Sequence, residues 1–201
     1  MKKLPKFSKS AILVEQKQPL VVDYVELPSE LSYGQVLVEI FVSGICGSQI
    51  GEIKGVKGKD NFLPHLLGHE GVATVLEVGP SVKNIAIGDK VVIHWRPGKG
   101  INAKTPTYKY KGGKINAGWA TTFNEFAIIS ENRVTKINNK YDMKLLTNYT
   151  ADTLTALSPL SSDSTSNSTA WSCLSVLKSF SDTMLEKCTK TSVPSSLVMK
   201  P

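Results

Sequence analysis

Glycine is missing from the last part of the chain. The sequence has 15 glycines in 201 residues, and none of them lies after Gly118. A dinucleotide-binding Rossmann domain needs a G-x-G-x-x-G segment, because glycine lets the backbone approach a pyrophosphate closely. Residues 119–201 therefore exclude this motif, and we expect no domain for a nicotinamide cofactor within them.

Cysteines and long apolar runs are also scarce. The three cysteines, Cys46, Cys173 and Cys188, do not make a disulfide framework, which fits a reducing compartment. No stretch approaches the roughly 18 apolar residues of a membrane-spanning helix. The basic start is followed by an apolar run, residues 11–14, that is too short for a signal peptide. These absences predict a cytoplasmic protein with no membrane partner.

The charge of the chain is basic, with a formal net charge of +7 and a pI near 9.2. Nucleic-acid binding normally needs lysines and arginines gathered on one face, with aromatic residues between them. Here the lysines are scattered, and the densest stretch, residues 99–114, is typical of a basic β-hairpin. We therefore predict a solvated basic surface and no nucleic-acid partner.

The first part of the chain is a series of short β-strands separated by glycine and proline. Val36, Val38, Ile40 and Val42 alternate with other residues and predict one apolar strand face. Strands at this spacing, with turn signals between them, indicate a mainly β protein with a barrel or sandwich. The expected strands are residues 11–15, 21–27, 35–42, 71–78, 90–95, 107–115 (a hairpin turning at Gly112-Gly113), 121–129 and 133–137.

The composition changes after Tyr141. The chain becomes rich in serine and threonine, and residues 161–169 form a low-complexity polar run. Such a segment has too little apolar surface to offset the entropy of ordering it. Residues 171–185 are the one stretch with a helical pattern. We therefore predict a domain over residues 1–145 and an irregular tail over residues 146–201, which is either disordered or translated out of frame.

Two short segments carry candidate metal ligands. Cys46 ends an expected strand and has a glycine close on each side, and His69 and Glu70 begin another strand 23 residues later. A thiolate, an imidazole and a carboxylate are side chains that Zn²⁺ selects, and a catalytic zinc typically takes three protein ligands. Taken singly, each has a simpler explanation as a buried or hydrogen-bonded structural residue.

The surrounding motifs make the combination specific. They resemble the medium-chain zinc-dependent alcohol dehydrogenase family over about residues 8–145. The matching segments are Gly44-Ile45-Cys46-Gly47-Ser48, Pro64-x-x-Leu67-Gly68-His69-Glu70-Gly71, Val75-x-x-Val78-Gly79-x-x-Val82, Gly88-Asp89-Lys90-Val91 and Thr122-Phe123-Asn124-Glu125-Phe126-Ala127. The resemblance implies a GroES-like catalytic domain, which is a partly open β-barrel.

The same resemblance implies roles for individual residues. Cys46 and His69 match two ligands of the catalytic zinc, and Glu70 matches a carboxylate that lies beside the metal or coordinates it transiently. Ser48 matches the hydroxyl that passes the alcohol proton towards solvent. The implied cofactors are one zinc ion and NAD(P), and the implied partner is a small alcohol or polyol. The resemblance also implies that a full-length relative can form a homo-oligomer.

Several features depart from the family pattern. Gln49 stands where the family often has aspartate, and residues 95–120 lack the cysteines of a structural zinc. The third ligand of the catalytic zinc should lie near Ala151, where no Cys, His or Glu is found. Cys173, Cys188 and His65 are alternative ligands, but we expect the two cysteines to be tail residues and His65 to lie in a loop. His94, Trp95 and Trp119 are alternative cleft residues, but we expect His94 to end a strand and the tryptophans to pack in the barrel core.

The leading hypothesis is a catalytic-domain portion of a zinc-dependent alcohol or polyol dehydrogenase that is inactive alone. The alternative is a GroES-like binding or interaction module without catalysis. A zinc-free quinone reductase of the same superfamily is disfavoured, because such an enzyme has no need of the Cys46, His69 and Glu70 set.

Overall fold

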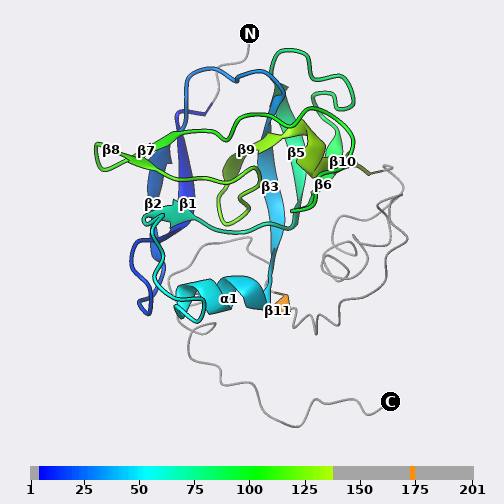
Figure 1. The fold of residues 1–201 in the computed structure, drawn as a ribbon. Coiled ribbons are helices and arrows are strands. Elements are labelled where there is room, and N and C mark those ends of the chain that lie inside the picture. Colours follow the sequence, from blue (N-terminus) through cyan, green and yellow to red (C-terminus); the bar gives the residue numbers. More distant parts are fainter. Residues whose placement is uncertain (1–4, 138–172, 175–201) are drawn as a thin grey trace, which may run out of the picture.

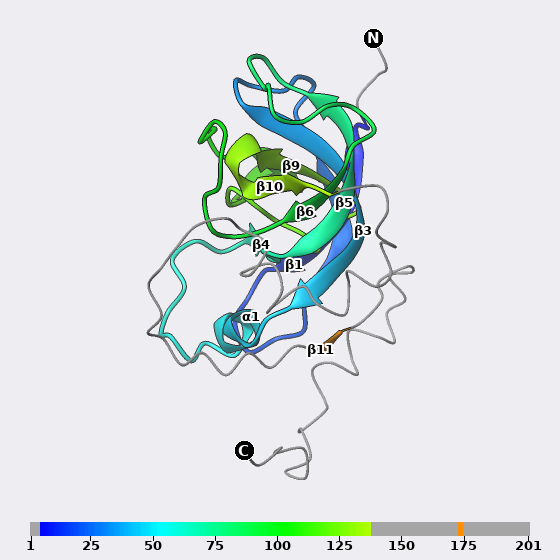
Figure 2. The ribbon, with the colours of Figure 1, turned by 90° about the vertical axis from the view of Figure 1, so that its right-hand side faces the viewer.

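The computed structural model describes residues 5–137 and 173–174, and its strands curl into a partly open β-barrel (Figures 1 and 2). One sheet has five strands, in which β1 pairs antiparallel with both β2 and β4. In spatial order this sheet contains β4 (His65–Leu66), β1 (Phe7–Leu13), β2 (Val21–Glu26), β7 (Tyr108–Tyr110) and β8 (Gly113–Ile115).

The second sheet is built around its longest strand, β3 (Gln35–Ile45), which pairs antiparallel with β5, β9 and β11. The spatial order is β10 (Val134–Lys136), β6 (Lys90–Ile93), β5 (Gly71–Val78), β3 and β11 (Cys173–Leu174), and β9 (Phe126–Ser130) pairs with β3 outside this order. The helix α1 (Gly47–Ile53) follows β3 and lies at one end of the barrel (Figure 1). A short 3-10 helix, η1 (Glu131–Arg133), follows β9.

Both faces of β3 are buried, because different apolar clusters cover them. Val36 and Val38 pack with residues of β5, β6 and β9, whereas Leu37 packs with residues of β1, β2 and β7. The expected alternation continues to Ile40, but an irregularity in the pairing with β5 lies between Ile40 and Val42. Since an extra residue reorients the side chains that follow it, Val42 belongs to a separate cluster.

Hydrogen bonds between the two sheets hold the barrel together. The Ala11 amide donates to the Phe123 carbonyl at 2.8 Å, and Ser10 forms a bridge with Asn124. The hydroxyl of Tyr108, which is fully buried, accepts a hydrogen bond from the Ile128 amide at 2.8 Å. The β7–β8 hairpin is therefore anchored to β9 by a polar contact inside an apolar core.

The mainly β barrel is confirmed, and β5 has the predicted bounds. Residues 121–125 precede β9 as irregular chain rather than as strand, and the helix α1 was not predicted. Residues 173–174 form a strand where the sequence pattern suggested a helix, and the rest of residues 138–201 lies outside the described part of the chain. No helix among the described residues is long and apolar enough to cross a membrane.

The prediction that Trp95 and Trp119 pack in the barrel core is wrong. Their side chains are 58% and 45% exposed. Both lie in loops outside the strands, and each ring contacts a guanidinium group: Arg96 lies over Trp95, and Arg133 lies over Trp119. A cation–π contact of this kind is compatible with a solvated surface.

Candidate functional site

Cys46 lies between the end of β3 and the first turn of α1, where it is the N-cap residue. The Ser48 hydroxyl donates to the Cys46 sulfur at 3.3 Å, so the predicted proton carrier lies directly beside the predicted ligand. The Cys46 amide donates to the side-chain oxygen of Gln49 at 3.4 Å. The short helix therefore fixes the orientation of three side chains around the end of β3.

His69 and Glu70 lie in the turn between β4 and β5. The Gly44 amide donates to the Glu70 carbonyl at 3.1 Å, and Ser43 pairs with Gly71 in the β3–β5 ladder. These contacts bring the turn next to the end of β3, two residues before Cys46. Gly68 precedes the turn with φ +92°, and a Cβ atom there would lie 2.7 Å from the Phe123 amide nitrogen. Only glycine fits this conformation and this space.

The Glu70 side chain is buried and occupies the space beside another glycine. A Cβ atom on Gly44 would lie 2.7 Å from Glu70 Oε1, so the absence of a side chain at Gly44 makes room for the carboxylate. The carboxylate thus lies against the strand that leads to Cys46. A thiol, an imidazole and a carboxylate held close to one strand end are a donor set that fits zinc.

The electrostatic environment of His69 favours a neutral imidazole. Burial, together with the positive charge of Lys57, lowers the pKa of His69 below its ordinary value of 6.5. A neutral imidazole keeps a lone pair for a metal, whereas a protonated one does not.

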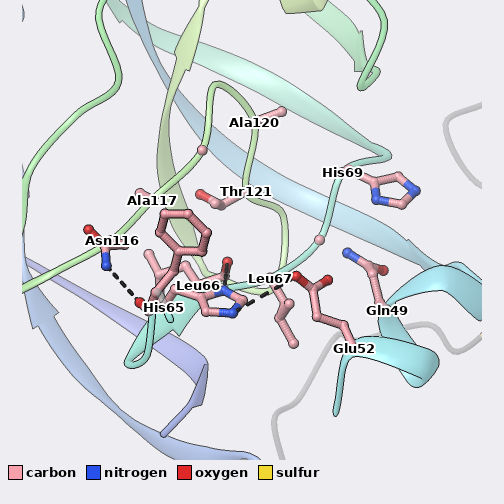
Figure 3. A pocket seen from close by; sticks show the side chains of 13 residues that line it. Gln49, Glu52, His65, Leu66, Leu67, His69, Asn116, Ala117, Ala120 and Thr121 are labelled. Atoms are coloured by element: carbon pink, nitrogen blue, oxygen red, sulfur yellow. Dashed lines mark hydrogen bonds and ion pairs between the residues drawn. The ribbon is translucent and has the colours of Figure 1, made fainter. Parts of the chain in front are cut away.

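A cavity of about 380 Å³ opens next to His69 (Figure 3). Its walls come from α1, from the segment 62–69 and from residues 116–121, so all three meet only in the folded barrel. The polar side chains that line it are those of Gln49, Glu52, His65, His69, Asn116 and Thr121. The cavity therefore connects the predicted zinc ligand His69 to a polar wall.

One cluster in this wall was not predicted. Glu52, Asp60 and His65 each offer one potential ligand atom, and these three atoms all lie within 4.8 Å of one another. Among the described residues, this is the group of His, Cys, Asp and Glu side chains that meets that spacing. His65 Nε2 lies 2.8 Å from Asp60 Oδ2 and 4.0 Å from Glu52 Oε1. The set of Cys46, His69 and Glu70 is not gathered this closely, and it stays a prediction.

No sequence motif predicts this cluster, because its members come from a helix, a loop and a strand. His65 was expected in a loop, but it lies in β4, buried and paired with Leu13. His94 does not line the cavity; its ring nitrogens contact the Arg96 carbonyl at 2.7 Å and the Thr135 hydroxyl at 2.9 Å.

The tail enters the described structure only at β11. Cys173 lies opposite Ile45 in the backbone pairing of β11 with β3, and Ile45 immediately precedes Cys46. The positions near Ala151 and the residue Cys188 lie outside the described part of the chain.

The comparison with known families decides what kind of domain this is. Residues 32–139 match the alcohol dehydrogenase GroES-like domain, which covers more than half of the chain. The chain belongs to this family. The GroES-like domain thus accounts for the barrel and for the segments that carry Cys46, His69 and Glu70.

Individual relatives of this GroES-like domain are dehydrogenases. An alcohol dehydrogenase of Geobacillus stearothermophilus is 43% identical over 87 residues, which are 43% of this chain and 26% of the relative. A D-arabinose 1-dehydrogenase (NADP(+)) of Saccharolobus solfataricus is 39% identical over 88 residues, covering 43% of this chain and 25% of the relative. The chain thus spans about a quarter of the length of these relatives.

Solved structures give the same picture. An alcohol dehydrogenase from Thermotoga maritima superposes with a TM-score of 0.51 at 26% identity, covering 70% of this chain and 43% of that one. A benzyl alcohol dehydrogenase from Acinetobacter calcoaceticus, at 18% identity, shares the fold with a TM-score of 0.56, covering 71% of this chain and 44% of that one. In both structures, more than half of the chain has no counterpart here.

Proposed function

We propose that this chain is the catalytic-domain portion of a zinc-dependent alcohol or polyol dehydrogenase of the cytoplasm. The observation that carries the proposal is the contact between Gly44 and Glu70, which brings the His69–Glu70 turn to the strand end that carries Cys46. Cys46 and His69 would hold the zinc ion, and Glu70 would lie beside it. Zinc, when bound, supplies a Lewis acid that lowers the pKa of an alcohol hydroxyl.

Two further features of the chain would serve the reaction: Ser48 would take the alcohol proton, and the cavity would hold the substrate. Ser48, hydrogen-bonded to the Cys46 sulfur and exposed to solvent, is placed to accept the alcohol proton and release it to water. The cavity beside His69 would hold the rest of the substrate. Oxidation also needs a hydride acceptor, NAD(P)⁺, and the glycine pattern excludes a binding motif for it after Gly118.

The zinc content of the purified chain tests this proposal. We expect zinc to bind to the wild-type chain, and Cys46→Ser and His69→Ala each to abolish binding, as measured by metal analysis after dialysis. Cys188→Ser is the matched control and should keep the metal. Unchanged zinc content in Cys46→Ser would contradict the proposed site. Loss of zinc in Cys173→Ser would identify that thiol as the third ligand.

We expect the 201-residue chain to oxidise no alcohol by itself, because its sequence contains no G-x-G-x-x-G segment to bind the hydride acceptor. The measurement is NAD(P)H formation from a panel of alcohols and polyols with the zinc-loaded chain. Turnover that disappears in Cys46→Ala would contradict this expectation and would require a cofactor site within the 201 residues.

A second candidate is a GroES-like binding or interaction module without catalysis. The exposed side chains of Trp95 and Trp119 favour it, because large exposed aromatic groups are typical of interaction surfaces. Stoichiometric binding of NAD(P)H by the purified chain would exclude this candidate.

A further inference from the structure

The polar wall of the cavity contains a hydrogen-bond donor, the side-chain amide of Gln49 (Figure 3). Gln49 is only 3% exposed, and its side-chain oxygen accepts from the Cys46 amide. Its amide nitrogen is directed into the cavity, between His69 and Glu52 (Figure 3). In the open cavity water can pair with this amide, so a ligand that displaces the water must offer an acceptor in its place.

A hydrogen-bond acceptor lies beside this donor. Glu52 follows Gln49 by three residues on α1, so both side chains share one face of the helix and line the same cavity. The Glu52 side chain is 38% exposed, and its carboxylate makes no hydrogen bond to another described residue. The cavity thus presents an amide donor and a carboxylate acceptor side by side.

The neighbouring His65 makes its hydrogen bonds to other groups, and Glu52 Oε1 lies 4.0 Å from His65 Nε2, beyond hydrogen-bond distance. Both ring nitrogens of His65 face oxygen acceptors, the Leu66 carbonyl at 3.1 Å and the Asp60 carboxylate at 2.8 Å. Burial raises the pKa of Asp60, but hydrogen bonds from the Phe62 amide and from His65 outweigh it and lower the pKa overall. A metal ion would have to break the His65–Asp60 contact, whereas a hydroxyl group can bind Glu52 without disturbing it.

We propose that Gln49 and Glu52 form a subsite for the non-reacting hydroxyl groups of a polyhydroxylated alcohol, and this inference rests on the proposed function. A hydroxyl group both accepts and donates, so adjacent hydroxyls can accept from the Gln49 amide and donate to the Glu52 carboxylate. An alkyl chain in the cavity would displace water from both groups and offer neither of them a hydrogen bond. Sites that hydrogen-bond a substrate hydroxyl discriminate strongly against analogues that lack it.

Binding of two five-carbon alcohols to the zinc-loaded chain tests the subsite without catalysis. Xylitol and 1-pentanol are titrated separately into the ¹⁵N-labelled chain, and the side-chain amide resonances of Gln49 report occupancy. We expect xylitol to bind at least about tenfold more tightly than 1-pentanol, as for a hydrogen bond to a charged group. Glu52→Gln should remove about tenfold of the xylitol affinity and leave 1-pentanol unchanged, whereas the exposed control Glu30→Gln should alter neither.

Equal affinities for the two alcohols, or an unchanged xylitol affinity in Glu52→Gln, would overturn the subsite. Metal analysis of the same samples provides a second check. Two zinc ions per chain, one of them lost in Glu52→Gln, would also overturn it, because the wall would then hold a cation. A chain that binds no zinc but still prefers xylitol through Glu52 would support the subsite while contradicting the proposed function.

Discussion

At the residue scale, Glu131 joins three segments of irregular chain. Its side chain is 1% exposed, and its two carboxylate oxygens accept hydrogen bonds from the backbone amides of Lys83, Asn84 and Ile101 at 2.8–2.9 Å. The Asn84 side chain adds a fourth hydrogen bond at 3.0 Å. These loops contain few strand hydrogen bonds of their own, so one buried carboxylate fixes them to η1.

Glu131→Gln should destabilise the barrel. The new amide group would face backbone N–H donors, so at least one buried donor would lose its acceptor. We expect the free energy of unfolding to fall by roughly 2–3 kcal/mol, measured by urea denaturation. The exposed residue Glu125 is the matched control, and Glu125→Gln should change the value by less than about 0.5 kcal/mol. Equal losses in the two variants would contradict this role of Glu131.

The same carboxylate should make the fold sensitive to acid. Burial raises the pKa of Glu131, but the hydrogen bonds it accepts outweigh burial and lower the pKa below 4.5. Because the folded pKa is the lower one, the stabilisation is present above pH 4.5 and is lost as the pH falls through the folded value. The difference in unfolding free energy between wild type and Glu131→Gln should therefore become smaller as the pH is lowered, as measured by urea denaturation. A constant difference would contradict this linkage.

Gly68 controls the turn that carries His69. Gly68→Ala would place a Cβ atom against the Phe123 amide at positive φ, so we expect a loss of more than about 1 kcal/mol in unfolding free energy and weaker zinc binding. Gly112 also has positive φ, but its Cβ would meet nothing within 4 Å. Gly112→Ala is the control for backbone strain alone and should keep the zinc. Equal zinc loss in both variants would count against a local effect.

At the element scale, β3 is the strand on which both sheet pairing and core packing converge. Leu37 is 1% exposed and faces the cluster shared with β1, β2 and β7. Leu37→Ala should lower the unfolding free energy by about 2–5 kcal/mol in urea denaturation, through lost burial and a residual cavity. Val56, at 76% exposure, is the control, and Val56→Ala should have little effect. A small loss for Leu37→Ala would mean that the core refills the space.

The strands were predictable because apolar residues alternate between turn signals, and this pattern is local. The helix α1 was not, because it is seven residues long and includes Gly47 and Gly51, which disfavour helix. Contacts from distant segments stabilise it: Ile53 packs near the cluster of β1, and the Gln16 side chain donates to the Glu52 carbonyl at 3.3 Å. Helix propensity, which depends on the local sequence alone, does not predict such contacts.

At the scale of the whole molecule, the described core belongs to residues 5–137. All four apolar clusters lie there, and β11 adds two paired residues to β3. We therefore expect the chain cut after residue 145 to unfold cooperatively, with a free energy within about 1 kcal/mol of the full chain. Urea denaturation of both chains is the measurement. A truncated chain that fails to fold would show that residues 146–201 belong to the domain.

The strand pattern, the family and the candidate ligands are all readable from the sequence, because they depend on residue types at short spacings. The absence of glycine after Gly118 likewise excluded a cofactor motif without any structure. The contacts between residues distant in the sequence required the folded structure. It paired the His69–Glu70 turn with Gly44 near the end of β3, left Trp95 and Trp119 exposed, and brought Glu52 close to the His65–Asp60 pair. Such contacts form when the strands close into a barrel and bring distant segments together. No local pattern in the sequence encodes them.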